Sequence, residues 1–332
     1  MLSSATHQSA PIPSTLGSHI APPYVGNGAY CYANSTTMLL TTIGEHIAPS
    51  TIEVLTGVGL GASLLAGGSE IFFSNLGTAP DIGIGKALEI LGFTCEERAH
   101  DDGADAPFDE LRDLLSRGPV ILGPVDMGHL TYVPHHREAS GSDHFVLAFA
   151  IDDREIHQHD PAGYPYVSLP LADLAQAWRA ERISYRRSAY RSWTAPQRHE
   201  HPDATTIYTR ARKWFQACYD EADAISAEQR YGPWLNAQAA ISRFVENIQR
   251  ADVSPQVRGH LVYFALPLGA KRALDYAAFF DAYEPNLAAL KRHQAHLFGQ
   301  SYTHAVRSRW EAVAAILTEL ADVEAAFRTA LV

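Results

Sequence analysis

The chain has 332 residues, of which 46% are hydrophobic and 19% charged, and its formal net charge at pH 7 is −11. This length predicts two domains, or one domain with a large appendage. The acidic balance argues against a general nucleic-acid-binding protein, because such proteins carry basic surfaces. Cys31, Cys95 and Cys218 are far apart and lack CxxC spacing, which argues against a disulfide framework or a cysteine zinc site and favours the reducing cytoplasm.

Residues 1–22 contain many Ser, Pro and His residues and predict an extended N-terminal arm. They have no basic n-region and no long apolar core, so a signal peptide is not expected. No stretch of the chain approaches 18 uninterrupted apolar residues, so no membrane span is expected either. These features together predict a cytoplasmic protein.

The first half of the chain mixes helical and strand patterns. A helical pattern runs from about residue 34 to 42, and glycine-containing loops follow over 51–92, ending in a helix that Gly92 terminates. Another helix is predicted over residues 107–118, which begin with Pro107 and end with Gly118. The period then changes to that of strands, and a short DDR turn between the last two strands predicts a hairpin. The predicted strands are 119–125, 144–152 and 155–160.

The second half becomes helical after a polar linker. A short strand (164–170), a helix (171–180) and a closing strand (182–193) precede the linker at 194–206. The last segment places apolar residues on one helical face. They are Val306, Trp310, Val313, Ala314, Leu317, Leu320 and Val323. We therefore predict an arm (1–22), an α+β domain (23–200) and an all-α C-terminal domain (201–332).

Cys31, in "GNGAYCYANSTTMLL", is the first candidate for chemistry. The glycines before it allow a tight turn, and a helix starts after it. A thiol at a helix N-terminus is activated when an imidazole lies nearby, and the first amides of the helix can stabilise an oxyanion. The alternative is a buried small apolar residue, which is the usual state of a free cysteine and our interpretation of Cys95 and Cys218.

His144 and Asp160 are the candidate partners of Cys31. His144 opens one strand of the predicted hairpin and Asp160 ends the other, so their ends come together and the carboxylate can orient the imidazole. Taken singly, His144 is a sheet-edge histidine and Asp160 a turn former before Pro161. A cysteine on a helix, followed by histidine and aspartate on a sheet, is the papain-like arrangement.

Four ordered segments carry a resemblance to a known family. They are "CYANSTTMLL…GVGLGASLL", "LLSRGPVILGPVDMGHLTYVP", "DHFVLAFAIDD" and "HDPAGYPYVSLPLADLAQAW". This set, over residues 24–185, resembles the N-terminal domain of butirosin biosynthesis protein H and its relatives, which are similar to the cysteine peptidases that process double-glycine leader peptides. The C-terminal part is similar in layout to the helical domain that often follows in that family.

The resemblance implies a papain-like fold that forms amides instead of cutting peptides. Cys31 would accept an acyl group from the phosphopantetheine thioester of an acyl or peptidyl carrier protein, with His144 as base and Asp160 as its orienter. A small-molecule amine would then receive the acyl group, and no further cofactor is implied. Where leader peptidases carry a glutamine before the cysteine, this chain has Val25 and Asn27. Asn27, or the backbone amides at Cys31 and Tyr32, would form the oxyanion hole.

Two further groups of residues have competing interpretations. Asp126, His129 and Tyr132 either line the acceptor side, with Asp126 holding a cationic amine, or belong to a loop that packs on the hairpin. A basic group either docks an acidic carrier protein or pairs with carboxylates of the chain itself. Its members are Arg179, Arg182, Arg186, Arg187 and Arg191. The histidines match no zinc motif, so no metal is expected.

Three classes of function stay open at this point. The first is a cysteine-dependent acyltransferase of natural-product biosynthesis, forming an amide or a lactam. The second is a peptidase or amide hydrolase with the same triad, and the third is a non-catalytic scaffold that binds a carrier protein. The apolar stripes of the C-terminal helices have three possible roles: they cover the first domain, form a lid or make a homodimer face. Packing in the core is the favoured interpretation.

Overall fold

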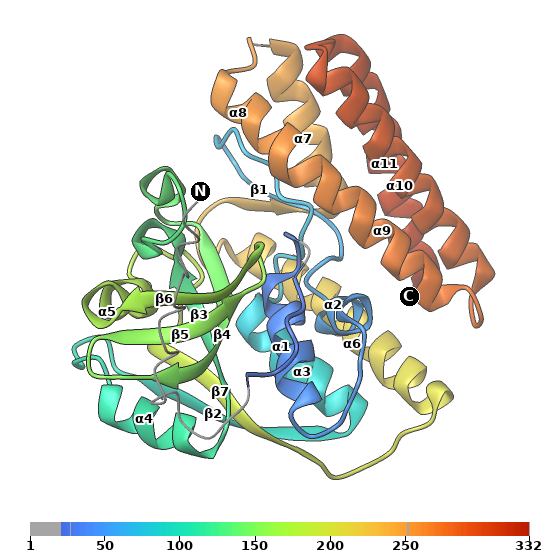
Figure 1. Ribbon diagram of the computed structural model, residues 1–332. Helices are drawn as coiled ribbons and strands as arrows, with labels where there is room; N and C mark the ends of the chain where they lie inside the picture. The colour runs from blue at the N-terminus through green and yellow to red at the C-terminus, as the bar shows by residue number, and fades with distance from the viewer. Residues whose placement is uncertain (1–20, 27, 251, 332) are drawn as a thin grey trace, which may run out of the picture.

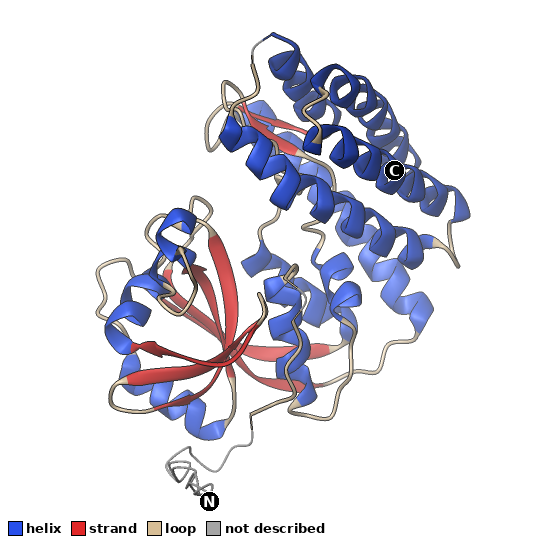
Figure 2. Ribbon diagram, turned by 45° about the horizontal axis from the view of Figure 1, so that its top comes forward, coloured by secondary structure: helices blue, strands red, loops and turns tan. Residues whose placement is uncertain are grey.

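The computed structural model describes residues 21–26, 28–250 and 252–331. The predicted arm, residues 1–22, therefore lies almost wholly outside the described residues. Within them the chain is α+β, with antiparallel sheets and a helical C-terminal part, as the sequence predicts (Figures 1 and 2). None of the helices in these ranges combines the length and apolar character needed to cross a membrane.

The larger sheet has six antiparallel strands in the order β2-β7-β3-β4-β5-β6. The strands β4 and β5 form the predicted hairpin, with Ile151 opposite Ile156. The closing strand expected over 182–193 begins only at Ala189, because the preceding residues form turns, in which Arg186 and Arg187 make ion pairs. The strands are β2 (Phe93–His100), β3 (Val120–Asp126), β4 (Asp143–Ile151), β5 (Glu155–Asp160), β6 (Tyr164–Pro170) and β7 (Ala189–Arg198).

Helices cover both faces of this sheet. Side chains along a strand alternate between its faces, so Ile121 and Leu147 pack against α1 and its neighbours, whereas Val120 and Val146 pack against α4 and α5. Burial on both faces explains why every residue of β3 is buried. The helices of this part are α1 (Cys31–Thr41), α2 (Pro49–Thr56), α3 (Pro80–Leu91), α4 (Phe108–Arg117) and α5 (Leu171–Arg179).

The C-terminal part is helical from Ala204 onward, as predicted, apart from one short strand, β8 (Trp234–Asn236), so the all-α prediction is wrong there. The apolar stripe expected from residue 306 to 323 is shared between two helices. Because α10 ends at Val306, this side chain is 40% exposed, whereas Leu317 on α11 is buried. The helices are α6 (Ala204–Glu228), α7 (Ala237–Arg250), α8 (Pro255–His260), α9 (Leu266–Phe280), α10 (Pro285–Val306) and α11 (Trp310–Leu331).

One of the glycine-containing loops predicted over 51–92 packs inside the helical part. Its residues Ser63–Leu65 form β1, which pairs antiparallel with β8. Leu64, Ile71 and Phe73 are buried in the same apolar cluster as residues of α7, α9, α10 and α11. The first part of the chain therefore contributes to the core of the second.

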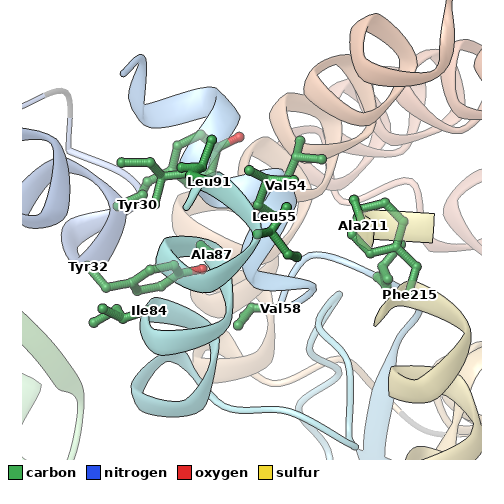
Figure 3. Close-up of a cluster of buried hydrophobic side chains, with 14 of the residues drawn as sticks. Tyr30, Tyr32, Val54, Leu55, Val58, Ile84, Ala87, Leu91, Ala211 and Phe215 are labelled. Carbon is green, nitrogen blue, oxygen red and sulfur yellow. The ribbon is translucent and has the colours of Figure 1, made fainter. Parts of the chain in front are cut away.

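A second buried cluster spans both predicted domains (Figure 3). Tyr30 and Tyr32, at the start of α1, share it with Leu55 of α2, Phe215 of α6 and Tyr276 of α9. The proposed division near residue 200 thus separates two chain segments that share buried cores. The start of α1 lies where these segments meet.

Candidate active site

Cys31 is the first residue of α1 and is partly exposed. Tyr30, directly before it, has left-handed backbone angles (φ 59°, ψ 44°), and Gly28 has φ 76°. This turn is held by Asn34, whose buried amide donates to the carbonyl oxygens of Ala29 at 2.6 Å and Tyr30 at 3.0 Å. The first amides of a helix have no carbonyl partner within the helix. The amides that follow the turn can therefore bind an anion.

The loop before Cys31 is attached to the turn that follows Asp160. The hydroxyl of Tyr24 donates to the backbone oxygen of Asp160 and accepts from the amide of Gly163, both at 3.0 Å. The amide of Gly28 donates to the carbonyl of Pro161 at 3.2 Å. These bonds bring the start of α1 to the end of β5.

His144 and Asp160 meet at the ends of the β4–β5 hairpin, as the sequence predicts. Nε2 of His144 lies 2.6 Å from Oδ1 of Asp160, and both side chains are buried. Burial raises the pKa of Asp160, but the charge of His144 and hydrogen bonds from His144, Ala162 and Tyr132 lower it, and the net pKa lies below its usual range. Asp160 is therefore ionised at neutral pH and orients the imidazole.

His144 also contacts Cys31. Burial lowers the pKa of His144, but the charges of Asp160 and Cys31 and hydrogen bonds to both raise it, and the net pKa lies well above its ordinary value. Since Nε2 is bound to Asp160, Nδ1 is the nitrogen left for the thiol. The arrangement can move a proton from Cys31 to His144 and hold the resulting imidazolium against Asp160.

Tyr132 belongs to this group in a different role from the one predicted. Its hydroxyl donates to Oδ2 of Asp160 at 2.8 Å and accepts from Nε2 of Gln158 at 3.0 Å. Burial and the charge of Asp160 raise the pKa of Tyr132, so the phenol stays protonated as a donor. The hydroxyl of Tyr132 is thus used to orient Asp160, and its role on the acceptor side stays a prediction.

The positions of Asp126 and His129 agree with the alternative prediction, a loop that packs on the hairpin. Asp126 is buried, and its Oδ1 accepts from the amides of Gly128 at 2.8 Å and Gly141 at 2.9 Å. It therefore shapes two loops, which agrees with the loop interpretation, and the binding of a cationic amine stays a prediction. His129 lies in the short 3-10 turn Met127–His129 and is partly exposed, outside the hydrogen-bonded group around Asp160.

The predicted oxyanion-hole residues have different outcomes. Asn27 lies outside the described residues. The side chain of Tyr32 points into the core, where its hydroxyl accepts from Nη2 of Arg272 at 3.0 Å. Of Tyr32, only the backbone amide in the first turn of α1 is left as a candidate donor to an oxyanion, together with that of Cys31.

The predicted docking arginines are engaged within the chain. Arg191 is only 8% exposed and pairs with Glu97 and Asp81, so it is not a surface docking residue. The others have partners as well: Arg186 and Arg187 pair with carboxylates, as the alternative interpretation expects, whereas the hydrogen bonds of Arg182 and Arg179 go to hydroxyl groups. These contacts are Arg187 with Asp81 (2.8 Å), Arg186 with Asp102 (2.8 Å), Arg182 with Ser140 (2.7 Å) and Arg179 with Tyr190 (2.8 Å).

Cys95 and Cys218 differ from Cys31 in their surroundings. Burial raises the pKa of Cys95 to about 12, and its Sγ donates to the carbonyl of Thr194 at 2.8 Å. Cys218 is 1% exposed on α6, and burial raises its pKa as well. Both thiols therefore stay protonated at neutral pH.

Sequence reasoning missed two residues of the site. Tyr185 donates to Oδ2 of Asp143 at 2.8 Å; burial and the charge of Asp143 raise its pKa, and the charge of Cys31 adds to this. Its phenol therefore lies within electrostatic range of the thiol, although its segment was predicted as strand. The role of Asn34 could have been predicted more easily, because a residue one helical turn after Tyr30 lies next to it on the same face of the helix.

Across the described ranges, no three His, Cys, Asp or Glu side chains converge in a way that would hold a metal ion. The buried His159 is committed to the backbone instead. Its Nε2 lies 3.0 Å from the carbonyl of Pro22, and its Nδ1 accepts from the amide of Tyr166 at 3.1 Å. Burial lowers the pKa of His159, so the ring is neutral at neutral pH and fixes residue 22 to the sheet.

Comparison with known proteins gives two matches. A family model described as "YobF C-terminal domain" matches residues 232–332. A protein of Bacillus subtilis (strain 168), described as "Uncharacterized protein YobF", is 39% identical over 308 residues, which cover 93% of this chain and 97% of the relative. The similarity thus extends over the sheet, the Cys31 region and the C-terminal helices together.

Proposed function

The chain belongs to the YobF family, and from its site we propose that it is a cysteine-dependent acyltransferase that forms an amide. The observation that carries the proposal is the connected series Cys31, His144 and Asp160, with the thiol at a helix N-terminus and the carboxylate 2.6 Å from the imidazole. The two other thiols differ from Cys31 in that burial raises the pKa of both Cys95 and Cys218.

Under this proposal the α+β part has a papain-like fold. Its support is that α1 carries the nucleophile while neighbouring strands of an antiparallel sheet carry the base and its orienter. The resemblance of residues 24–185 to the butirosin biosynthesis protein H family supports transfer in preference to hydrolysis. The donor is then an acyl thioester on a carrier protein, the acceptor is an amine, and the setting is cytoplasmic.

The first step is acylation of Cys31. His144 takes the thiol proton, and Sγ attacks the carbonyl carbon of the thioester. The backbone amides at the start of α1 stabilise the oxyanion. When the tetrahedral intermediate collapses, the carbon–sulfur bond to the carrier breaks and the carrier thiolate leaves with the proton from His144. One thioester replaces another, so no nucleotide is consumed.

The second step transfers the acyl group to the amine. The nitrogen attacks the acyl carbon, His144 accepts the proton that the nitrogen loses, and the bond from carbon to Sγ breaks. Cys31 recovers its proton from His144, so the triad returns to its starting state. Asp160 holds the imidazolium in place during both proton transfers.

The test uses intact-mass spectrometry with the acetyl thioester of N-acetylcysteamine as donor. We expect a mass increase of one acetyl group on the wild-type chain and on Cys95→Ala, and no increase on Cys31→Ala. Adding a primary amine should remove the acetyl group and give the N-acetyl amide. An adduct that persists in Cys31→Ala contradicts the proposal.

Two other results would replace the proposal with one of its alternatives. Release of free acetate at the same rate with and without amine would make the chain a hydrolase with the same triad. A wild-type chain that forms no adduct, and whose Cys31 alkylates no faster at pH 6 than it does in urea, would make it a non-catalytic binding protein.

A further inference from the structure

Helix α9 holds the residue directly before Cys31. The hydroxyl of Tyr30 donates to Oδ2 of Asp275 at 2.7 Å, and Nζ of Lys271 lies 4.4 Å from the centroid of the Tyr30 ring. Burial and the charges of Glu53 and Asp275 raise the pKa of Tyr30, so its phenol stays protonated as the donor. These contacts join residues about 240 positions apart in the chain.

The same helix holds the residue directly after Cys31. Arg272 is 7% exposed, and its Nη2 donates to the hydroxyl of Tyr32 at 3.0 Å. Its Nε donates to Oε1 of Glu53 at 2.8 Å and its Nη1 to the carbonyl of Phe73 at 2.9 Å. The bonds to Glu53 and Phe73 fix the guanidinium, which in turn fixes the Tyr32 ring.

The backbone at Tyr30 needs such support. A left-handed conformation costs a residue with a side chain about 1–2 kcal/mol, and it persists only where the surroundings determine it. Asn34 holds the carbonyl of Tyr30, but the side chain of Tyr30 itself makes no cap hydrogen bond to the first turn of α1. Both tyrosine rings instead enter the buried cluster between α1, α2, α3 and α9 (Figure 3).

We infer that α9 is a positioning element for the nucleophile, acting through the Tyr30–Asp275 and Tyr32–Arg272 hydrogen bonds on either side of Cys31. Fixing the residues before and after Cys31 fixes its backbone angles and the direction of its Cα–Cβ bond toward His144. The inference rests on the proposed function in one respect, that Cys31 is the nucleophile. It gives the region matched by the YobF C-terminal domain, residues 232–332, a part in the active site.

Thiol alkylation tests this without knowledge of the substrates. The rate of Cys31 modification by iodoacetamide, followed by intact mass from pH 5 to 9, is compared for wild type, Tyr30→Phe and Asp275→Asn. A misplaced thiol loses contact with His144, so we expect both variants to lose about tenfold or more of the rate at pH 6. Their rates should approach wild type at pH 9, where an unassisted thiol also ionises.

Tyr219→Phe is the matched control. The hydroxyl of Tyr219 donates to a carboxylate oxygen of Glu324 at the same 2.7 Å, in the helical part and outside the Cys31 site. We expect Tyr219→Phe to lose about as much stability in urea as Tyr30→Phe does. Its rate of Cys31 alkylation should nevertheless depend on pH as the wild-type rate does. The double variant Tyr30→Phe/Asp275→Asn should lose no more rate than either single variant, because the two residues share one contact.

The outcomes separate this inference from the proposed function. A wild-type chain that is reactive at pH 6, with Tyr30→Phe and Asp275→Asn following the same profile, overturns the inference and leaves the proposed function standing. A rate loss of equal size in Tyr219→Phe overturns it too, because any weakening of the helical part would then suffice. A wild-type chain without reactivity at pH 6 contradicts the proposed function, and the inference falls with it.

Discussion

Tyr132→Phe tests the hydrogen-bonded group behind His144. The substitution removes the hydroxyl that donates to Oδ2 of Asp160 at 2.8 Å and keeps the ring, whose centroid lies 5.9 Å from that of Tyr164. A hydrogen bond to a charged group contributes about 1.5–3 kcal/mol. Because the Asp160 side chain is fully buried, water does not replace the lost donor. We expect the free energy of unfolding at pH 7 to fall by about 1.5–3 kcal/mol.

The same change has a pH signature. The Tyr132 hydroxyl favours the ionised form of Asp160, so its loss raises the pKa of Asp160. In wild type this pKa lies below the unfolded value. The stabilisation is therefore present above about pH 4 and is lost as pH falls through the folded-state pKa. In the variant the folded-state pKa lies closer to the unfolded one, so the loss should be smaller and should be complete at a higher pH.

Urea unfolding between pH 3 and 7, followed by tryptophan fluorescence, measures both effects, with Tyr164→Phe as control. Tyr164 is the aromatic neighbour of Tyr132, so the control changes the same surroundings without removing the donor to Asp160. The reasoning is refuted if the two variants agree within about 0.5 kcal/mol at every pH. If Tyr132→Phe then raised only the KM for the amine, Tyr132 would have the acceptor role predicted from the sequence.

Three other substitutions probe the site. His144→Gln removes the base. The rate of Cys31 alkylation by iodoacetamide at pH 6, followed by intact mass, should then fall about 100-fold or more. An unchanged rate would contradict the Cys31–His144 contact. Gly28→Ala puts a Cβ at φ 76° in otherwise open space and should cost about 1–2 kcal/mol in urea unfolding; no loss would mean that the turn relaxes. In Asp160→Asn, stability should fall less steeply than in wild type below about pH 4, and equal slopes would deny that Asp160 has a depressed pKa.

The core of the site was predictable because it depends on local geometry. Two antiparallel strands joined by a short turn bring their far ends together, so the positions of His144 and Asp160 on the hairpin determine that they meet. The glycines before Cys31 likewise indicated the turn that starts α1. Each of these inferences used segments of fewer than about 20 residues, within which the chain has few alternatives.

The rest depended on contacts between distant segments. Nothing near Tyr132 in the sequence says whether its hydroxyl faces a substrate or Asp160, because that depends on how a loop folds back over the hairpin. The sequence leaves open whether Arg191 docks a partner or pairs within the chain, because its carboxylate partners come from the distant elements α3 and β2. The attachment of Tyr30 to Asp275 spans 245 residues and has no local signal at all.

The same distant contacts bear on how the two parts of the chain work together. The matched C-terminal region begins at residue 232, but Leu64, Ile71 and Phe73 complete its apolar core and β1 pairs with its only described strand, β8. In return, α9 reaches the residues beside Cys31. Each part thus buries a segment of the other, and removing either would expose apolar surface that is fully covered in the whole chain. A relative that is similar over both parts at once is what such mutual dependence requires.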